Sequence, residues 1–206
     1  TETRYISNIE IVAKNIENKI NNLRQSNELL EIGLAGSAFE RLETLKATTR
    51  SLTRSLIIAI ICTYIILLFA FRNMRIALIT TIPVILVASW LYGTMKILGF
   101  GLNFVTATVG AISIGVGIDY AVHMTQRFRE EYKKTLSVDY ALIKAVSSTG
   151  IALFASAISS IVGFGIMAFA PMPLFATYGL LTACMILYAF LASILILPLL
   201  LKWTHT

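Results

Sequence analysis

The amino-acid sequence predicts an all-α integral membrane protein with five membrane-spanning helices. The chain of 206 residues is 57% hydrophobic and only 14% charged, a composition that soluble domains seldom have. Its apolar residues gather in long runs, and residues 145 to 201 contain no charged residue. The basic residues cluster beside these runs, as topology signals do, so the net charge of +6 does not indicate a nucleic-acid partner.

The first 50 residues are more polar and predict the end of a larger domain outside the membrane. Apolar residues recur at helical spacing between Ile9 and Leu23, which predicts an amphipathic helix. Residues 29–34 predict a short strand, and Ser37 with Glu40 forms a capping-box pattern that begins a helix leading into the membrane. A helix, strand and helix of this length are too small for an independent domain. Because the chain also begins without Met, we expect a fragment of a longer protein.

Residues 51–203 are the predicted membrane domain. A span needs about 20 mostly apolar residues. Pro83 inside the second span is expected to be tolerated as a kink, and Ala170-Pro-Met-Pro173 divides the long uncharged run in two. A short amphipathic helix at about 137–146 is expected to lie on the membrane surface. The predicted spans are about 55–71, 76–95, 104–124, 149–169 and 175–200.

The distribution of basic residues predicts the orientation of the chain. With five spans, three basic regions fall on one side of the membrane, and the positive-inside rule makes that side cytoplasmic. We therefore expect the N-terminal segment outside, the C-terminus inside, and a location in the plasma or inner membrane. Arg50 and Arg54 on the outer side conflict mildly with this assignment. The three regions contain Arg72 and Arg75, then Arg127, Arg129, Lys133, Lys134 and Lys144, and finally Lys202.

The third span carries an acid inside an apolar run. Roughly 22 uncharged residues separate Lys96 from Asp119, enough to cross a bilayer. An ionisable residue in such a segment is costly, so it usually faces a protein partner or a water-filled path. Small residues let another helix approach closely, which predicts a polar site at a seam between helices. The predicted packing residues of this span are Ala111 and Gly115, which share a face with Asp119 and His123 at a spacing of four, and Gly117.

Other interpretations of these residues remain open from the sequence. An Asp near a helix end can cap the helix or reach the membrane surface. His123 lies near the water boundary, where a solvated or structural histidine is at least as common as a proton relay. The fourth span offers Ser156, Ser159 and Ser160 as hydrogen-bonding candidates, with Gly163 as a packing position. Serines in membrane helices commonly bond their own backbone instead.

The sequence does not favour an enzyme. Gly115-Val-Gly-Ile-Asp119 differs by one residue from the Gly-x-Gly-Asp motif of intramembrane aspartyl proteases, and the other spans contain no acid for a catalytic dyad. A phosphate-binding glycine-rich loop and a metal-ligand cluster are not recognisable, so we expect no cofactor or metal. Cys62 and Cys184 both lie in apolar runs, and a disulfide is not expected.

Several motifs occur in a specific order along the chain. They are Phe71-Arg-Asn-Met-Arg75, the string from Gly115 to Glu131 that reads Gly-x-x-x-Asp-Tyr-x-x-His-x-x-x-Arg-x-Arg-Glu, Ser148-Thr-Gly150, Gly163-Phe164 and Leu197-Pro198. Together they resemble the MMPL, hopanoid-exporter and Patched branch of the resistance-nodulation-division (RND) superfamily, over about residues 30–203. The resemblance implies the end of an extracytoplasmic porter domain at residues 1–50, followed by a five-helix half-bundle. The sterol-sensing domain family shares this five-helix unit. A second membrane half, in the same chain or another protomer, is the implied partner.

The resemblance also implies a function. Asp119 would relay protons that power export, with Tyr120 as its partner and His123 as a further member of the relay. Lipids or other hydrophobic molecules would be the substrates. The alternative hypothesis is a sterol-sensing-like or structural module that binds lipid without moving ions. In that case Asp119 would serve folding and not flux.

Overall fold

The computed structural model describes residues 12, 15–16, 37–101 and 104–203, and these form helices without a strand. Of the predicted helix before residue 25, only residues 12, 15 and 16 are described, and they are helical. The predicted strand at 29–34 lies outside the described residues. The described part of the chain therefore confirms an all-α protein.

The first long helix, α2 (Ser37–Phe71), is 35 residues long and continuous, as the sequence predicts. It ends where Arg72 adopts a positive φ of 51°. The next residue, Asn73, begins α3 (Met74–Ile97) by accepting hydrogen bonds from the backbone N–H groups of Arg75 at 3.0 Å and Ile76 at 3.2 Å. This cap satisfies donors that the first turn of a helix leaves free, so two long antiparallel helices are joined by a very short turn.

The predicted third span is α4 (Phe104–Thr135), which continues to residue 135 instead of ending near 124. A second residue with positive φ, Leu136 at 54°, follows it. Ser137 then caps α5 (Val138–Met167), which is one uninterrupted helix. The predicted separate surface helix at 137–146 is therefore wrong. Residues 138–167 contain no proline, and Ala141, Ala145 and Gly150 along this stretch are buried, so helix propagation and packing both continue into the span.

The last predicted span contains an irregularity that the sequence analysis did not anticipate. Helix α6 (Pro173–Leu191) passes into a π-helical turn, η1 (Ala192–Ile196), and then into α7 (Leu197–Trp203). Pro198 explains the change, because it has no N–H and its ring would collide with the carbonyl four residues earlier in an α-helix. Wider π-type hydrogen bonding absorbs this conflict without ending the span. Pro83, by contrast, lies buried within a continuous α3.

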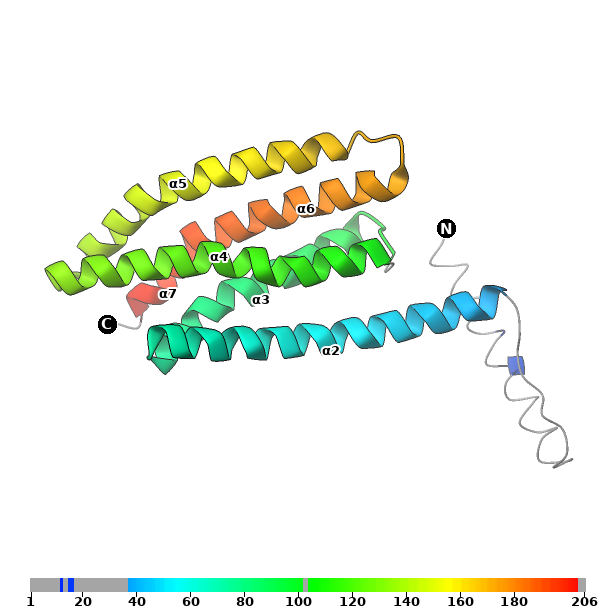
Figure 1. The fold of residues 1–206 in the computed structure, drawn as a ribbon, viewed down its shortest axis with the longest axis horizontal. Helices are drawn as coiled ribbons and strands as arrows, with labels where there is room; N and C mark the ends of the chain where they lie inside the picture. The colour runs from blue at the N-terminus through cyan, green and yellow to red at the C-terminus, as the bar shows by residue number, and fades with distance from the viewer. Residues whose placement is uncertain (1–11, 13–14, 17–36, 102–103, 204–206) are drawn as a thin grey trace, which may run out of the picture.

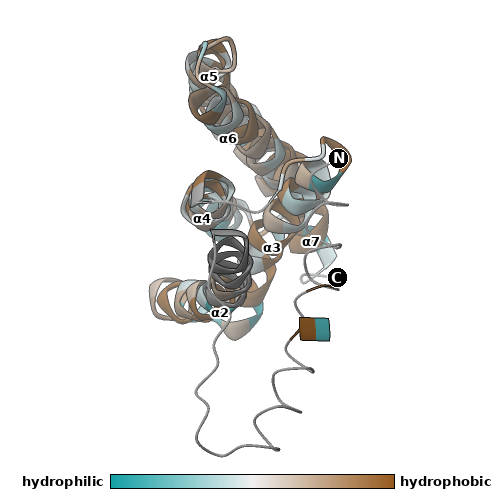
Figure 2. Ribbon diagram, turned by 90° about the vertical axis from the view of Figure 1, so that its right-hand side faces the viewer, coloured by the Kyte–Doolittle hydropathy of each residue, from teal (hydrophilic) through white to brown (hydrophobic). Residues whose placement is uncertain are grey.

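The helices form an elongated bundle in which α4 contacts all the others (Figure 1). Helices α2 and α5 lie on opposite sides of the bundle, and α3, α4 and α6 lie between them (Figures 1 and 2). The α2–α3 turn, the α4–α5 turn and the end of α7 lie at one end of the bundle. We call this the basic end, because these regions contain Arg72, Arg75, Arg127, Arg129, Lys133, Lys134, Lys144 and Lys202.

In the described part of the chain, five helical segments are long and apolar enough to cross a bilayer, as expected of a multi-pass membrane protein. The bundle has a main core and a smaller cluster where α2, α3 and α4 meet. Large apolar side chains also remain exposed on the outside of the helices. In lipid such exposure is not costly, and helices associate through close packing and interhelical hydrogen bonds.

Candidate functional site

Asp119 lies on α4 beside an open groove between α4 and α5. The groove has a volume of about 450 Å³. Its apolar walls surround a small set of polar groups from both helices, an arrangement typical of ligand and ion sites. The lining residues are Val116, Asp119, Tyr120 and His123 of α4, and Thr149, Ala152, Leu153 and Ser156 of α5.

The three predicted relay residues all reach this groove, but their burial differs. Asp119 and His123 are exposed, whereas Tyr120 is only 7% exposed. Ser156 of α5 lines the same groove as Tyr120, so hydroxyl groups of both helices lie in the groove with the acid. The structure thus places Asp119, Tyr120, His123 and Ser156 together.

The other two candidate serines do not line the groove. Ser159 is exposed and Ser160 is partly buried, both on α5. The sequence could not separate Ser156 from them, because all three lie within two turns of one helix. The rotation of α5 against α4 decides which hydroxyl lines the groove.

The predicted packing glycines divide into two groups. Gly117 is buried, and a side chain there would meet Val84 of α3 at 3.7 Å, so it lies where α3 and α4 approach closely. Gly115 and Gly163 have no atom within 4 Å of the position a side chain would occupy. Ala111 is exposed on the same side of α4 as Gly115 and Asp119. This small-residue face of α4 is therefore uncovered by the described residues.

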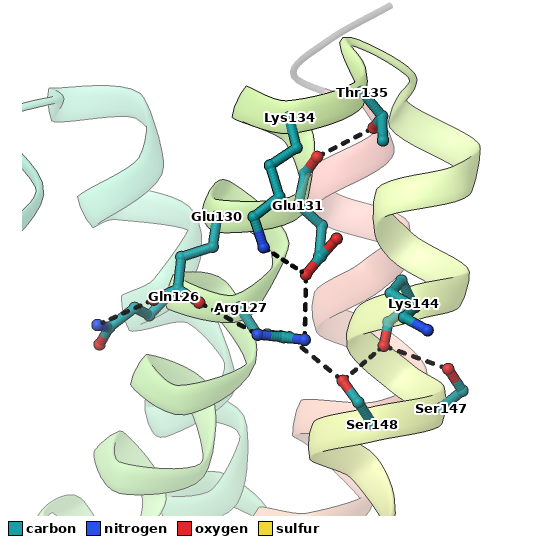
Figure 3. A network of polar contacts seen from close by, with 9 residues as sticks. All are labelled: Gln126, Arg127, Glu130, Glu131, Lys134, Thr135, Lys144, Ser147 and Ser148. Atoms are coloured by element: carbon teal, nitrogen blue, oxygen red, sulfur yellow. Dashed lines mark hydrogen bonds and ion pairs between the residues drawn. The ribbon is translucent and has the colours of Figure 1, made fainter.

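A polar network joins α4 to α5 at the basic end (Figure 3). Arg127 forms an ion pair with Glu131 at 3.0 Å, and its Nε donates a hydrogen bond to Ser148 Oγ of α5 at 3.3 Å. Lys134 forms a second ion pair with the same Glu131 oxygen at 3.1 Å. The Glu131 side chain is 8% exposed, against 48% for Glu130, which pairs with Arg127 at 3.4 Å. Glu131 therefore holds the centre of the network.

The groove and this network are connected along one face of α4. Asp119, His123, Arg127 and Glu131 follow one another at a spacing of four residues, so they lie one above the other. Asp119 is eight residues before Arg127, about 12 Å along the helix axis. Polar and titratable groups thus extend from the groove toward the basic end.

The residues that fix the position of α4 against α3 and α5 were not predicted from the sequence. The hydroxyls of Thr80 on α3 and Thr125 on α4 lie 3.0 Å apart and are buried, and Arg127 contacts Ser148. Only the Arg127–Glu131–Lys134 spacing of four and three residues could have been found from sequence, since pairs at this spacing meet on a helix. The contacts between helices depend on tertiary packing.

The geometry can support proton transfer through a carboxyl, a phenol and an imidazole. In the described part of the chain, no three His, Cys, Asp or Glu residues gather as they would around a metal ion. The groove lining contains no Lys or Arg. Asp119 therefore has no Lys or Arg counter-ion in this lining, and His123 is the basic side chain that shares the groove with it.

Comparison with known proteins adds independent information. The MMPL family matches residues 5–204. A membrane protein of Methanocaldococcus jannaschii is 34% identical over 134 residues, which are 65% of this chain and 34% of that protein. The sulfolipid-1 exporter MmpL8 of Mycobacterium tuberculosis is 28% identical over 144 residues, 68% of this chain and 13% of the exporter. The hopanoid transporter HpnN of Rhodopseudomonas palustris is 29% identical over 103 residues, 49% of this chain and 12% of the transporter.

The chain spans about a third or less of the length of these relatives. The family match nevertheless covers nearly the whole chain and includes both the groove and the basic end. It confirms the resemblance inferred from the Asp-Tyr helix. This chain belongs to the MMPL family.

Proposed function

We propose that this chain is the membrane-embedded part of a proton-driven exporter of lipids or other hydrophobic molecules. The observation that carries the proposal is Asp119, an acid within an apolar span that lines a groove whose lining contains no Lys or Arg. An acid in this setting is costly and marks an ion or substrate path by default. The relatives named as exporters of sulfolipid-1 and as a hopanoid transporter support the substrate class.

The proposed relay uses the groups that share the groove. Asp119 takes up and releases the proton, and Tyr120 and Ser156 provide hydroxyls beside it. His123 is one helical turn nearer the basic end and passes the proton toward water. The basic end is cytoplasmic by the positive-inside rule, so protons would leave on that side.

The uncovered face of α4 is where a second membrane half would pack. Ala111, Gly115 and Asp119 leave room for a helix backbone to approach closely. A change in the charge of Asp119 would then alter the packing between the halves. Helix α2 would carry that movement to the domain outside the membrane.

The test is proton flux in the intact protein reconstituted in liposomes with a trapped pH-sensitive dye. Asp119→Asn keeps the side-chain shape and removes the titration. We expect it to abolish proton-coupled flux while the protein remains folded. Asp139→Asn is the matched control, because Asp139 is 71% exposed and pairs only with Lys202 in a surface ion pair. Unchanged flux in Asp119→Asn would overturn the proposal.

A second candidate function is a lipid-binding module without ion transport. The apolar walls of the 450 Å³ groove favour it, since they suit part of a lipid molecule. If neither the unsubstituted protein nor Asp119→Asn moves protons, while a fluorescent sterol or phospholipid binds in the groove, this function replaces the exporter.

A further inference from the structure

Helix α2 is anchored to the bundle near its C-terminal end. Among its described side chains, which are Ala47 and residues 54–71, the buried ones are Thr63, Leu67 and Phe71. They recur every four residues and so form one stripe in the last turns. The described side chains before Thr63 are all at least partly exposed. The buried side chains of the described part of α2 are therefore confined to its C-terminal turns.

The end of the buried stripe of α2 belongs to a cluster that contacts the turn of α4 carrying Asp119. Leu67 and Phe71 form a cluster with Ile76 and Ala77 of α3, apart from the main core. Two side chains of α4, Ile118 and Val122, pack against this cluster. Ile118 directly precedes Asp119. A displacement of this turn of α4 would therefore move a side chain that packs against the end of α2.

Arg129 of α4 binds the final residue of α2 in two ways. Its Nη2 donates a hydrogen bond to the backbone carbonyl of Phe71 at 3.0 Å. Its guanidinium carbon also lies 5.1 Å from the centroid of the Phe71 ring, a cation–π contact. The last carbonyls of a helix lack partners within the helix and carry partial negative charge, so a cation is favourable there. The described residues offer Arg129 no carboxylate within ion-pair distance.

Arg129 and Arg127 hold α4 on two sides. They are two residues apart, which is about 200° around a helix, so they point in nearly opposite directions. Arg127 contacts Ser148 of α5, as Figure 3 shows, whereas Arg129 contacts Phe71 of α2. One arginine therefore belongs to the groove side of α4 and the other to the α2 side.

We propose that Arg129 is a positioning residue that makes α2 follow the movement of α4. The proposal rests on the proton-driven function of Asp119 given above. When the charge of Asp119 changes and α4 shifts, the hydrogen bond and the cation–π contact between Arg129 and Phe71 move the end of α2 together with α4. Helix α2 is continuous over 35 residues, about 52 Å, so a displacement of its C-terminal end moves the whole helix as a rigid unit.

The experiment measures movement of α2 directly. Spin labels are placed at Ser55→Cys on α2 and Leu180→Cys on α6, both exposed positions, after Cys62→Ser and Cys184→Ser remove the native thiols. The distance between the labels is measured in the intact protein in liposomes at alkaline and at acid pH. Proton flux is measured on the same samples with a trapped dye.

In the unsubstituted background we expect the distance to change with pH, and in Asp119→Asn we expect one distance at both pH values. Arg129→Gln should reduce the pH-dependent change to less than about half, because a charged hydrogen bond and a cation–π contact are both lost. Arg129→Lys keeps the charge and should restore part of the movement. Arg75→Gln, which removes an exposed arginine at the same end, should behave as the background protein.

The outcomes separate this inference from the proposed function. Full α2 movement in Arg129→Gln, or equal loss in Arg75→Gln, would overturn the role of Arg129, as would an α2 that does not move in the background protein. Unchanged proton flux in Asp119→Asn would instead overturn the relay. Should Arg129→Gln fail to fold, Phe71→Leu, which keeps the carbonyl and removes the ring, decides by the same measurement. Full α2 movement in Phe71→Leu then contradicts the proposal, and reduced movement supports it.

Discussion

Thr125 of α4 donates a hydrogen bond to Thr80 of α3, with 3.0 Å between the two buried hydroxyl oxygens. The direction follows from a second contact, because the Thr80 hydroxyl gives its single hydrogen to the Ile76 carbonyl at 2.8 Å. The pair lies one and a half turns beyond Asp119 along α4, nearer the basic end. It therefore fixes the depth of α4 against α3 close to the proposed relay.

This pair should be measurable in a double-mutant cycle. Thr80→Val and Thr125→Val each keep the shape of the side chain and remove the hydroxyl. We expect a coupling of about 0.6 kcal/mol in the free energy of unfolding, the average for hydrogen bonds between membrane helices. Reversible unfolding in mixed detergent micelles provides the measurement. If the two changes are additive, the hydrogen bond does not contribute to stability.

Gly179 of α6 should not tolerate a side chain. A Cβ atom there would lie 2.5 Å from the Phe164 carbonyl oxygen and 3.0 Å from the Ala168 nitrogen, and backbone atoms cannot move aside as a flexible side chain does. We expect Gly179→Ala to lower the free energy of unfolding by about 1–3 kcal/mol.

Gly93→Ala is the matched control, since no atom lies within 4 Å of its added Cβ and it also lies inside a helix. Thermal unfolding in detergent, followed by circular dichroism, compares the two variants. Equal melting temperatures for Gly179→Ala and Gly93→Ala would contradict the close contact between α5 and α6.

The buried acid of the basic-end network should matter more than its exposed neighbour. Glu131→Gln removes the buried charge that Arg127 and Lys134 share, so Lys134 loses this ion pair and Arg127 retains its pair with the more exposed Glu130. Glu130→Gln is the control, because Glu130 is far more exposed and surface pairs contribute little. We expect the Glu131 variant to unfold at a lower temperature than the Glu130 variant. The reverse order would exclude Glu131 as the centre of the network.

The groove serines should differ in their effect on proton flux. Tyr120→Phe and Ser156→Ala each remove a hydroxyl that lines the groove with Asp119, and we expect each to slow flux by about tenfold, the value of one hydrogen bond near 1.4 kcal/mol. Ser159→Ala removes a hydroxyl outside the groove and should leave flux unchanged. An equal effect of Ser156→Ala and Ser159→Ala would show that the groove geometry is irrelevant to transport.

Chemical composition and hydrophobic runs were enough to predict the class of the protein. The five spans follow from the lengths of the apolar runs and from the prolines that divide the last run, and α2 was expected to continue from Ser37 to Phe71. The family followed from the string around Asp119 and Tyr120, because its spacing is specific. These properties are local in the chain, so no knowledge of packing is needed to recognise them.

Helix ends were less predictable where charge and propensity disagreed. The amphipathic residues 137–146 predicted a separate surface helix, yet α5 continues through them because its alanines pack and no proline intervenes. The π-turn at 192–196 was also missed. Its cause, Pro198, is visible in the sequence, but a proline can kink, end or locally widen a helix. Neighbouring helices decide among these outcomes.

The sequence by itself determined which residues occupy the membrane and which face of α4 carries Asp119 and His123, since helical periodicity sets both. Only the tertiary structure decided the partners across helices. It selected Ser156 over Ser159 for the groove, brought Thr80 to Thr125, and placed Phe71 against Arg129. The physical reason is that periodicity fixes direction around one helix axis, whereas contact between helices depends on their relative rotation and depth. Those two quantities come from the packing of the whole bundle.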